Sequence, residues 1–165
     1  MSRLTIDTVY LKDMLAELLS IASPTGYTDT IVRAAVAELR RLGVEMEITR
    51  RGAIRARLRG KSARGARAMI AHLDTLGAQV KMLKDNGRLE LVPVGTWSAR
   101  FAEGARVTVF TDQGAYRGTI LPLMASGHAF NTQVDDQPVN WEQVELRIDE
   151  YADTDEDLRR LGVNV

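Results

Sequence analysis

His72 and Asp74 are the residues of this sequence whose types and spacing best suit chemistry. They end the apolar run Ile70-Ala71-His72-Leu73-Asp74, and side chains two positions apart point to the same side of an extended chain. Imidazole is a good ligand for zinc or cobalt, and a carboxylate beside it can orient the ring. The pattern therefore predicts a metal-binding corner at the end of a strand. A purely structural hydrogen bond is the alternative, because a His-x-Asp pair also arises often by chance.

Two amphipathic helices are predicted ahead of this corner. Apolar residues recur at helical spacing over residues 11–19, after Asp7 or Thr8, either of which can cap the helix. A second helix is predicted after Thr28, with Gly43 placed to take the left-handed conformation at its end. The chain thus begins with two helices of the kind that cover a sheet.

Three strands are expected between the helices and the corner. Residues 45–48 and 54–58 alternate apolar with charged side chains, which is typical of half-exposed strands. After turn residues at 60–65, residues 66–73 form the least polar stretch and are expected to be a strand near the centre of a sheet. The order helix, helix, strand, strand, strand predicts an α/β domain.

The pattern changes after Gly77, where helical periodicity gives way to short strands separated by glycine turns. Tight hairpin turns are predicted at Asp85-Asn86-Gly87 and at Asp112-Gln113-Gly114, because such turns need residues that accept positive φ angles. Trp97 and Phe101 are expected to pack in the core of this barrel-like unit or at a subunit contact. The expected strands are residues 79–83, 89–94, 106–111, 116–121 and 144–148, followed by a short helix at 155–161.

Several other polar residues have simpler explanations than catalysis. His128 lies in a predicted loop and is expected to be solvated or bonded to the backbone, with a role as a metal partner as the alternative. Asp135-Asp136 is expected to form a turn rather than an acid–base pair. Residues 50–67 carry eight basic side chains, but these alternate with apolar residues and have no aromatic residue among them. That pattern favours the outer face of a strand or an intersubunit salt-bridging face over a nucleic-acid site.

The composition is that of a folded protein. With 165 residues and 45% hydrophobic content, the chain can bury one ordinary core or two small ones. Its 22 basic and 22 acidic residues balance, so no overall field favours nucleic acid or an anionic membrane. No cysteine is present, which limits metal ligands to histidine and carboxylates. No signal-peptide pattern and no apolar stretch of ~20 residues is found, and we therefore predict a cytoplasmic protein with no membrane partner.

The segment that contains the corner, Ile70-Ala71-His72-Leu73-Asp74-Thr75-Leu76-Gly77, resembles the first metal motif of the zinc aminopeptidases that form tetrahedral dodecamers. This family includes glutamyl and deblocking aminopeptidases. The loop Ser23-Pro24-Thr25-Gly26-Tyr27-Thr28 is similar to the family's loop between its first two helices. The resemblance departs at Thr75, where many relatives have glutamate. Further similar segments follow in matching order: Arg51-Gly52-Ala53-Ile54, Val94-Gly95-Thr96-Trp97, Gly104-Ala105-Arg106-Val107, Gly118-Thr119-Ile120 and Val144-Glu145-Leu146-Arg147-Ile148-Asp149.

The resemblance implies a metal-dependent aminopeptidase, in which a water activated by two divalent metal ions, zinc or cobalt, hydrolyses peptide substrates. His72 is then a terminal ligand to one metal ion, and Asp74 is the catalytic-site carboxylate that positions it. The family's other ligands and its general base lie beyond the point matched by Val165. This chain is thus expected to supply one ligand and to be inactive alone.

The resemblance also implies an architecture. Residues 1–76 are expected to form part of a three-layer α/β catalytic domain with helices and a mixed sheet, and residues 77–150 an inserted, small β-barrel-like domain that mediates homo-oligomerisation. Residues 151–165 are expected to begin the return to the catalytic domain. The alternative is a non-catalytic assembly or peptide-binding module built on the β domain.

Overall fold

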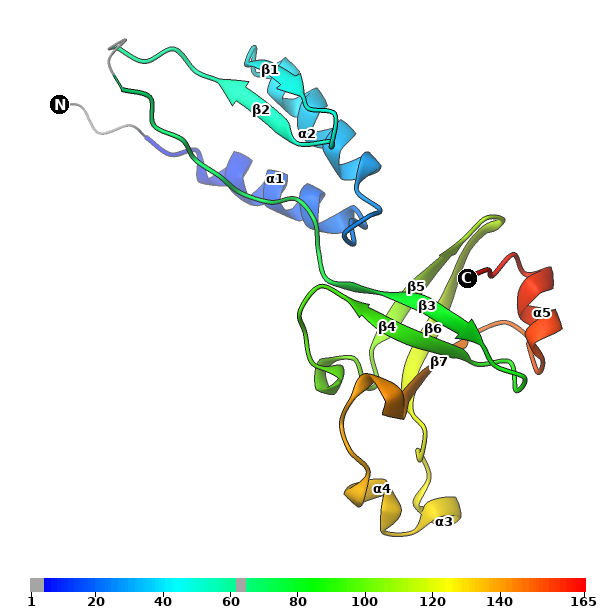
Figure 1. Ribbon diagram of the computed structural model, residues 1–165. Coiled ribbons are helices and arrows are strands. Elements are labelled where there is room, and N and C mark those ends of the chain that lie inside the picture. Colours follow the sequence, from blue (N-terminus) through cyan, green and yellow to red (C-terminus); the bar gives the residue numbers. More distant parts are fainter. Residues whose placement is uncertain (1–4, 62–64) are drawn as a thin grey trace. The chain divides into compact units, whose positions relative to one another are not determined.

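The computed structural model describes residues 5–61 and 65–165 and divides the chain into two compact units, Met1–Thr75 (unit 1) and Leu76–Val165 (unit 2) (Figure 1). Helices and antiparallel sheets make up both units, in keeping with the predicted mixture of α and β structure. None of the helices in the described residues has the length and apolar character that a membrane crossing requires.

The two predicted helices of unit 1 are confirmed as α1 (Thr8–Ser20) and α2 (Asp29–Arg41). Asp7 caps α1, because its Oδ1 accepts hydrogen bonds from two backbone N–H groups of the first turn at 3.0 and 3.1 Å. Beyond α2, Gly43 has a φ of 68°, a conformation that glycine adopts without steric strain. A side-chain cap therefore begins α1, and a glycine in the left-handed conformation follows the end of α2, whereas Thr28 at the start of α2 makes no side-chain capping hydrogen bond.

Two of the three strands predicted for unit 1 are confirmed. β1 (Glu45–Ile48) pairs with β2 (Ile54–Arg57) in an antiparallel hairpin. Arg55 on β2 forms an ion pair with Glu47 on β1 at 2.7 Å, so part of the basic run lies on the exposed face of a ribbon. The turn predicted at residues 60–65 includes Ser62 to Arg64, which lie outside the described residues.

The prediction of a third strand over residues 66–73 is wrong. These residues are extended but belong to no sheet, and Met69 and Ile70 are 100% and 93% exposed. A strand needs a neighbour that accepts its backbone hydrogen bonds, and in the described residues the nearest pairing is a parallel bridge between Pro24 and Thr75. The expected three-layer arrangement around a mixed sheet is therefore not formed by the described residues, whose two sheets have two and five strands.

Unit 1 exposes much of its apolar surface. Its described buried residues are Ser23, Ile31 and Val36, and α1 has no buried residue at all. The apolar stripe of α1 is open to solvent, with Leu15 53% and Leu19 71% exposed. Burial of apolar area is the main driving force for folding, so we expect unit 1 to be the less stable unit.

One polar cluster joins α1 to α2. The Tyr10 hydroxyl donates to Glu38 Oε1 at 2.5 Å, and Arg41 donates to the same carboxylate at 2.6 and 2.7 Å. The hydrogen bonds from Arg41 and then Tyr10 lower the pKa of Glu38 to about 2. The charged form of Glu38 is therefore part of the contact between the two helices.

Acidification is expected to weaken the contact between α1 and α2. Because the folded pKa of Glu38 lies below its ordinary value of 4.5, the stabilisation is complete above that value and is lost as the pH falls towards about 2. The thermal midpoint of unit 1 should therefore fall between pH 6 and pH 2. In Glu38→Gln this fall should be smaller, because the variant has no carboxylate at residue 38 to protonate. A Glu38→Gln variant with the same pH dependence as the wild type would contradict the assignment.

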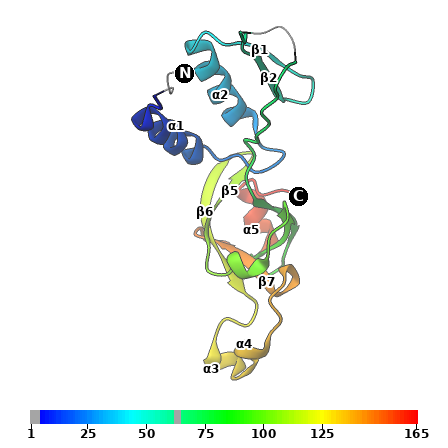
Figure 2. The same ribbon diagram turned by 90° about the vertical axis from the view of Figure 1, so that its left-hand side faces the viewer.

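Unit 2 is a curled antiparallel sheet, seen from two sides in Figures 1 and 2. Both predicted hairpins are confirmed, and Gly87 in the first turn has a φ of 72°. The strand order is β3-β4-β7-β6-β5, and no ladder joins β3 to β5 in the described residues, so the barrel-like unit is a half-barrel. The strands are β3 (Gly77–Leu83), β4 (Leu89–Val94), β5 (Arg106–Thr111), β6 (Gly114–Pro122) and β7 (Val144–Ile148).

A continuous core fills the concave side of this sheet. Leu89, Ile120 and Ile148 are each at most 1% exposed, and Leu158 from α5 (Asp155–Arg160) is completely buried among them. The predicted helix at 155–161 is thereby confirmed, and a capping box between Thr154 and Asp157 begins it. Unit 2 therefore has a larger buried core than the described residues of unit 1.

The two aromatic residues expected in this core, Trp97 and Phe101, differ in how far they are buried. Trp97 packs against it, its indole N–H donates to the Gly77 carbonyl at 2.9 Å, and its ring meets Trp141 edge-on at 4.7 Å between centroids. Phe101 is 76% exposed, so its expected core position is wrong. Phe101 lies in the short helix η1 (Ala99–Phe101), in which Ala99 is the buried residue. One turn of helix buries one side and leaves the other in solvent.

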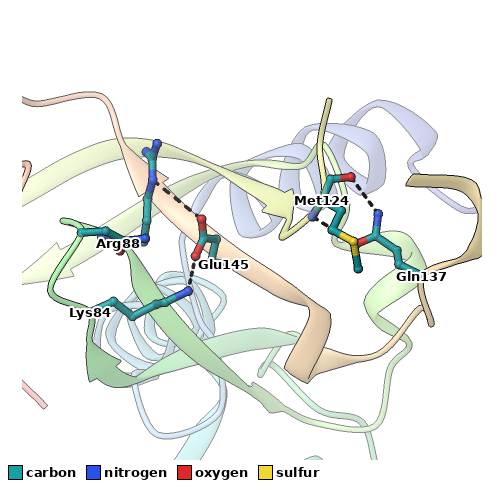
Figure 3. Close-up of polar contacts among 6 residues, drawn as sticks. Lys84, Arg88, Met124, Gln137 and Glu145 are labelled. Atoms are coloured by element: carbon teal, nitrogen blue, oxygen red, sulfur yellow. Dashed lines mark hydrogen bonds and ion pairs between the residues drawn. The ribbon is translucent and has the colours of Figure 1, made fainter. Parts of the chain in front are cut away.

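Between β6 and β7 the chain forms an arm (residues 125–136) that extends away from the sheet in both views (Figures 1 and 2). It holds two one-turn helices, α3 (Gly127–Phe130) and α4 (Gln133–Asp136), and no buried residue. The neck of the arm is closed by Gln137, whose side-chain amide accepts from the Met124 N–H at 3.2 Å and donates to its carbonyl at 2.9 Å (Figure 3).

A cluster of half-buried charged side chains links β7 to the turn between β3 and β4. The Glu145 carboxylate on β7 pairs with Lys84 and, at 3.7 Å, with Arg88, both in the β3–β4 turn (Figure 3). At the other side of the sheet, Arg106 holds Asp149 in a two-point contact that lowers the pKa of Asp149. Glu145 and Asp149 are thus both paired with basic side chains within unit 2.

Candidate metal centre

His72 and Asp74 lie together at the end of the extended segment of unit 1. The His72 Nδ1 atom is 2.9 Å from the Asp74 backbone carbonyl oxygen and 3.5 Å from Asp74 Oδ1. The two side chains are 83% and 41% exposed, respectively. The pair therefore forms a tight corner, here called the His72–Asp74 corner, with the imidazole facing outward.

The contacts of this corner define which ring nitrogen carries the proton. A carbonyl oxygen only accepts hydrogen bonds, so in the neutral ring Nδ1 must be the protonated nitrogen. The lone pair is then on Nε2, which has no hydrogen-bond partner among the described residues. This is the arrangement of a metal-ligating histidine, in which one nitrogen is held by an oxygen and the other is available.

A loop far away in the sequence holds the corner in place. Thr75 donates its N–H to the Ser23 carbonyl at 2.8 Å, and Thr25 donates its N–H to the Thr75 carbonyl at 3.3 Å. The Ser23 hydroxyl, which is completely buried, donates to the Leu73 carbonyl at 3.0 Å. The two backbone bonds form a parallel bridge between Pro24 and Thr75, and together with the Ser23 hydroxyl they fix the backbone on both sides of Asp74.

The Asp74 side chain is also held from this loop. The Thr25 hydroxyl donates to Asp74 Oδ2 at 2.6 Å, which leaves Oδ1 on the side of the imidazole. This hydrogen bond from Thr25 is the main cause that lowers the pKa of Asp74, so the group is a carboxylate at neutral pH. An anionic carboxylate beside Nδ1 further favours a proton on that nitrogen.

The described residues could supply one ligand, His72, to a metal ion at this corner. No group of three or more histidine, aspartate or glutamate side chains converges within the described part of the chain. A catalytic zinc site takes three protein ligands, so His72 needs ligands from outside these residues. His128 lies in α3, and Asp135 and Asp136 lie in the one-turn helix α4 rather than in the expected loop and turn.

The contribution of Ser23 and Thr25 was not apparent from the sequence. Their loop was recognised only as a segment similar to a family loop, and nothing in local periodicity indicates that residues 23–25 contact residues 73–75. Serine and threonine are common in loops, where their hydroxyls usually bond to nearby backbone groups. The contact spans about 50 residues of sequence, so only the fold reveals it.

Residues 52–165 match the family described as M42 glutamyl aminopeptidase. A relative from Bacillus subtilis, named "Putative aminopeptidase YhfE", is 34% identical over 154 residues, which cover 93% of this chain and 44% of the relative. The chain thus spans less than half the length of this relative.

Two solved structures show a similar fold. A TET aminopeptidase from a marine sediment thaumarchaeon has a TM-score of 0.80 at 20% identity, over 97% of this chain and 43% of its own. The TET1 peptidase of Pyrococcus horikoshii, which can assemble into a tetrahedron or a large octahedral shell, has a TM-score of 0.70 at 21% identity, over 93% of this chain and 44% of its own.

Proposed function

Because the chain belongs to the M42 glutamyl aminopeptidase family, we propose that it is the N-terminal portion of a metal-dependent aminopeptidase that removes N-terminal residues from peptides. The observation that carries the proposal is the His72–Asp74 corner, in which the imidazole Nε2 has no partner among the described residues of a chain of this family. The chain matches 44% of the length of its Bacillus relative, so most of the active site is proposed to lie outside these 165 residues.

Within this proposal His72 is a terminal ligand through Nε2, and Asp74 orients the ring from the Nδ1 side. Two divalent ions, zinc or cobalt, supply Lewis acidity toward the peptide carbonyl and toward the attacking water. The described residues contribute one ligand to that pair. We therefore expect no peptide hydrolysis by the 165-residue chain alone.

We also propose an architecture for the complete enzyme. Residues 1–76 form part of a three-layer catalytic domain, residues 77–150 form an inserted domain for homo-oligomerisation, and residues 151–165 begin the return. The similarity to a peptidase that assembles into closed shells supports self-association of this chain. A cytoplasmic location, and the lack of nucleic-acid and membrane partners, remain predictions.

The test uses the natural gene product, purified at the length at which the cell makes it. We expect it to release the first residue from a linear peptide and to leave a cyclic peptide of the same composition, which has no amino terminus, intact. A chelator should stop release, and zinc or cobalt should restore it. Release that survives chelation, or cleavage of the cyclic peptide at the same rate, would contradict a metal-dependent aminopeptidase.

A non-catalytic assembly or peptide-binding module is the second candidate. The observation that favours it is the continuous core of unit 2, whose members all belong to that unit and include Leu89, Ile120 and Leu158. If the natural gene product ends at Val165, self-associates and hydrolyses no peptide, the module is the correct assignment.

A further inference from the structure

We propose that Thr25 is a positioning residue for the His72–Asp74 corner, and that its hydroxyl keeps the His72 lone pair on Nε2, the nitrogen that would bind a metal ion. This inference rests on the proposed function, in which His72 is a metal ligand. Thr25 itself touches neither the imidazole nor any atom that would react. It acts through the Asp74 carboxylate.

The first step is the orientation of the carboxylate. The Thr25 hydroxyl bonds to Asp74 Oδ2 at 2.6 Å, while Oδ1 is 3.5 Å from His72 Nδ1. A carboxylate rotates easily about its Cβ–Cγ bond, because that torsion has a broad minimum. Fixing one oxygen on Thr25 therefore fixes the other beside the ring. The backbone of Thr25 is itself anchored to Thr75, so the hydroxyl is not free to follow a moving carboxylate.

The second step is the choice of tautomer. Two acceptors face Nδ1, namely the Asp74 carbonyl at 2.9 Å and Asp74 Oδ1 at 3.5 Å. A ring with its proton on Nε2 would turn the Nδ1 lone pair toward both of these oxygens, and like partial charges repel. With the carboxylate held by Thr25, the Nδ1–H tautomer is favoured and Nε2 carries the lone pair. Without the hydroxyl, the carboxylate can turn away and this preference weakens.

The expected loss of zinc affinity follows from the linkage between the tautomer population of His72 and metal binding. The apparent affinity of a metal for Nε2 falls in proportion to the fraction of rings that hold the lone pair there. The loss of one hydrogen bond in the support of the corner should weaken zinc binding by about 2- to 10-fold. The change in tautomer population and the change in zinc affinity should therefore agree.

The experiment compares Thr25→Val with Thr25→Ser. Valine keeps the branched shape and removes the hydroxyl, and the exposed position of Thr25 makes the exchange mild for folding. Serine keeps the hydroxyl and should restore the wild-type result. Thr28→Val is the matched control, because Thr28 lies in the same loop and its side chain makes no capping hydrogen bond. Amide spectra of each variant report whether the fold is kept, and Thr25→Ala replaces Thr25→Val if valine disturbs it.

The tautomer is read from the ¹⁵N chemical shifts of the imidazole in the 165-residue chain, at alkaline pH. The chain has two histidines, so His72→Ala assigns the signals. Because the 165-residue chain is proposed to supply one ligand only, the titration with zinc sulfate follows the Nε2 signal of His72 in the metal-free natural gene product and its variants. We expect the wild type, Thr25→Ser and Thr28→Val to hold the lone pair on Nε2, and Thr25→Val to show a mixture of tautomers with weaker zinc binding.

A failure of the positioning role of Thr25 can be distinguished from a failure of the ligand role of His72. If Thr25→Val has the wild-type tautomer population and the wild-type zinc affinity, Thr25 has no positioning role, whatever His72 does. If zinc shifts no His72 signal even in the wild type, the ligand role in the proposed function fails, while the tautomer shifts still decide whether Thr25 acts on the ring.

Discussion

Replacing His72 by alanine in the natural gene product is expected to lower peptide hydrolysis by more than about 100-fold, since groups that merely support a ligand already account for about 10- to 100-fold. The physical reason is the loss of Nε2, the ring nitrogen that has no partner in the described part of the chain. The measurement is kcat/KM for a peptide with a free amino terminus, at a saturating concentration of zinc or cobalt.

His72→Ala should have little effect on stability, because the side chain is 83% exposed and its contacts are local. The thermal midpoint therefore separates loss of chemistry from loss of fold. A variant that keeps the wild-type rate shows that His72 is not a ligand of the catalytic metal. A variant that loses activity together with its fold would point to a structural role for the corner instead.

Gly87→Ala is expected to destabilise unit 2 by about 2–5 kcal/mol. Gly87 has a φ of 72°, and a Cβ atom there would lie 2.0 Å from the Ala152 carbonyl oxygen and 2.6 Å from its carbon. The left-handed conformation contributes about 1–2 kcal/mol, and the forced separation of two backbone segments about 1–3 kcal/mol. Relief would require the β3–β4 turn to move away from the segment that leads into α5.

Gly104→Ala is the matched control for this substitution. Its φ of 74° is nearly the same, but no atom lies within 4 Å of the added Cβ. The difference between the two variants therefore isolates the clash with Ala152. By thermal unfolding of unit 2, Gly87→Ala should lower the midpoint by more than about 8 °C, and Gly104→Ala by clearly less. Equal shifts in the two variants would mean that the turn does not pack on Ala152 as described.

The helices and hairpins were predictable because their signals are local. The 3.6-residue spacing and the cap at Asp7 define α1 within the segment itself, and Asn86-Gly87 defines the first hairpin of unit 2. In each case the residues that determine the element lie inside it or next to it. The half-barrel follows from these hairpins once β7 pairs between β4 and β6.

The features that could not be predicted depend on partners far away in the sequence. Residues 66–73 have the apolar character of a central strand, but the described residues offer no strand beside them. Phe101 has the size of a core residue but lies on the outer side of a one-turn helix. The clamp between Gln137 and Met124 closes an arm whose two short helices show no periodicity long enough to detect.

The residues of the candidate site could be predicted from the sequence, but the hydrogen bonds that hold them in place could not. The spacing of His72 and Asp74 correctly indicated that the two side chains would be neighbours, with Nδ1 and Oδ1 3.5 Å apart. Their roles as metal ligand and positioning carboxylate stay predictions. The hydrogen bonds from Ser23 and Thr25 required the structure, because they cross from one loop to another. They explain how a corner that belongs to neither sheet of the described residues still has a defined geometry.

The metal content of the purified gene product, compared between the wild type and His72→Ala, tests the central claim most directly. His128→Ala is the control, because it removes the other histidine of this chain. After dialysis against zinc or cobalt, we expect two ions per chain in the wild type and in His128→Ala, and the loss of at least one ion in His72→Ala. Equal metal content in the wild type and His72→Ala, or no bound metal in the wild type, would contradict the assignment of His72 as a ligand in a two-metal aminopeptidase.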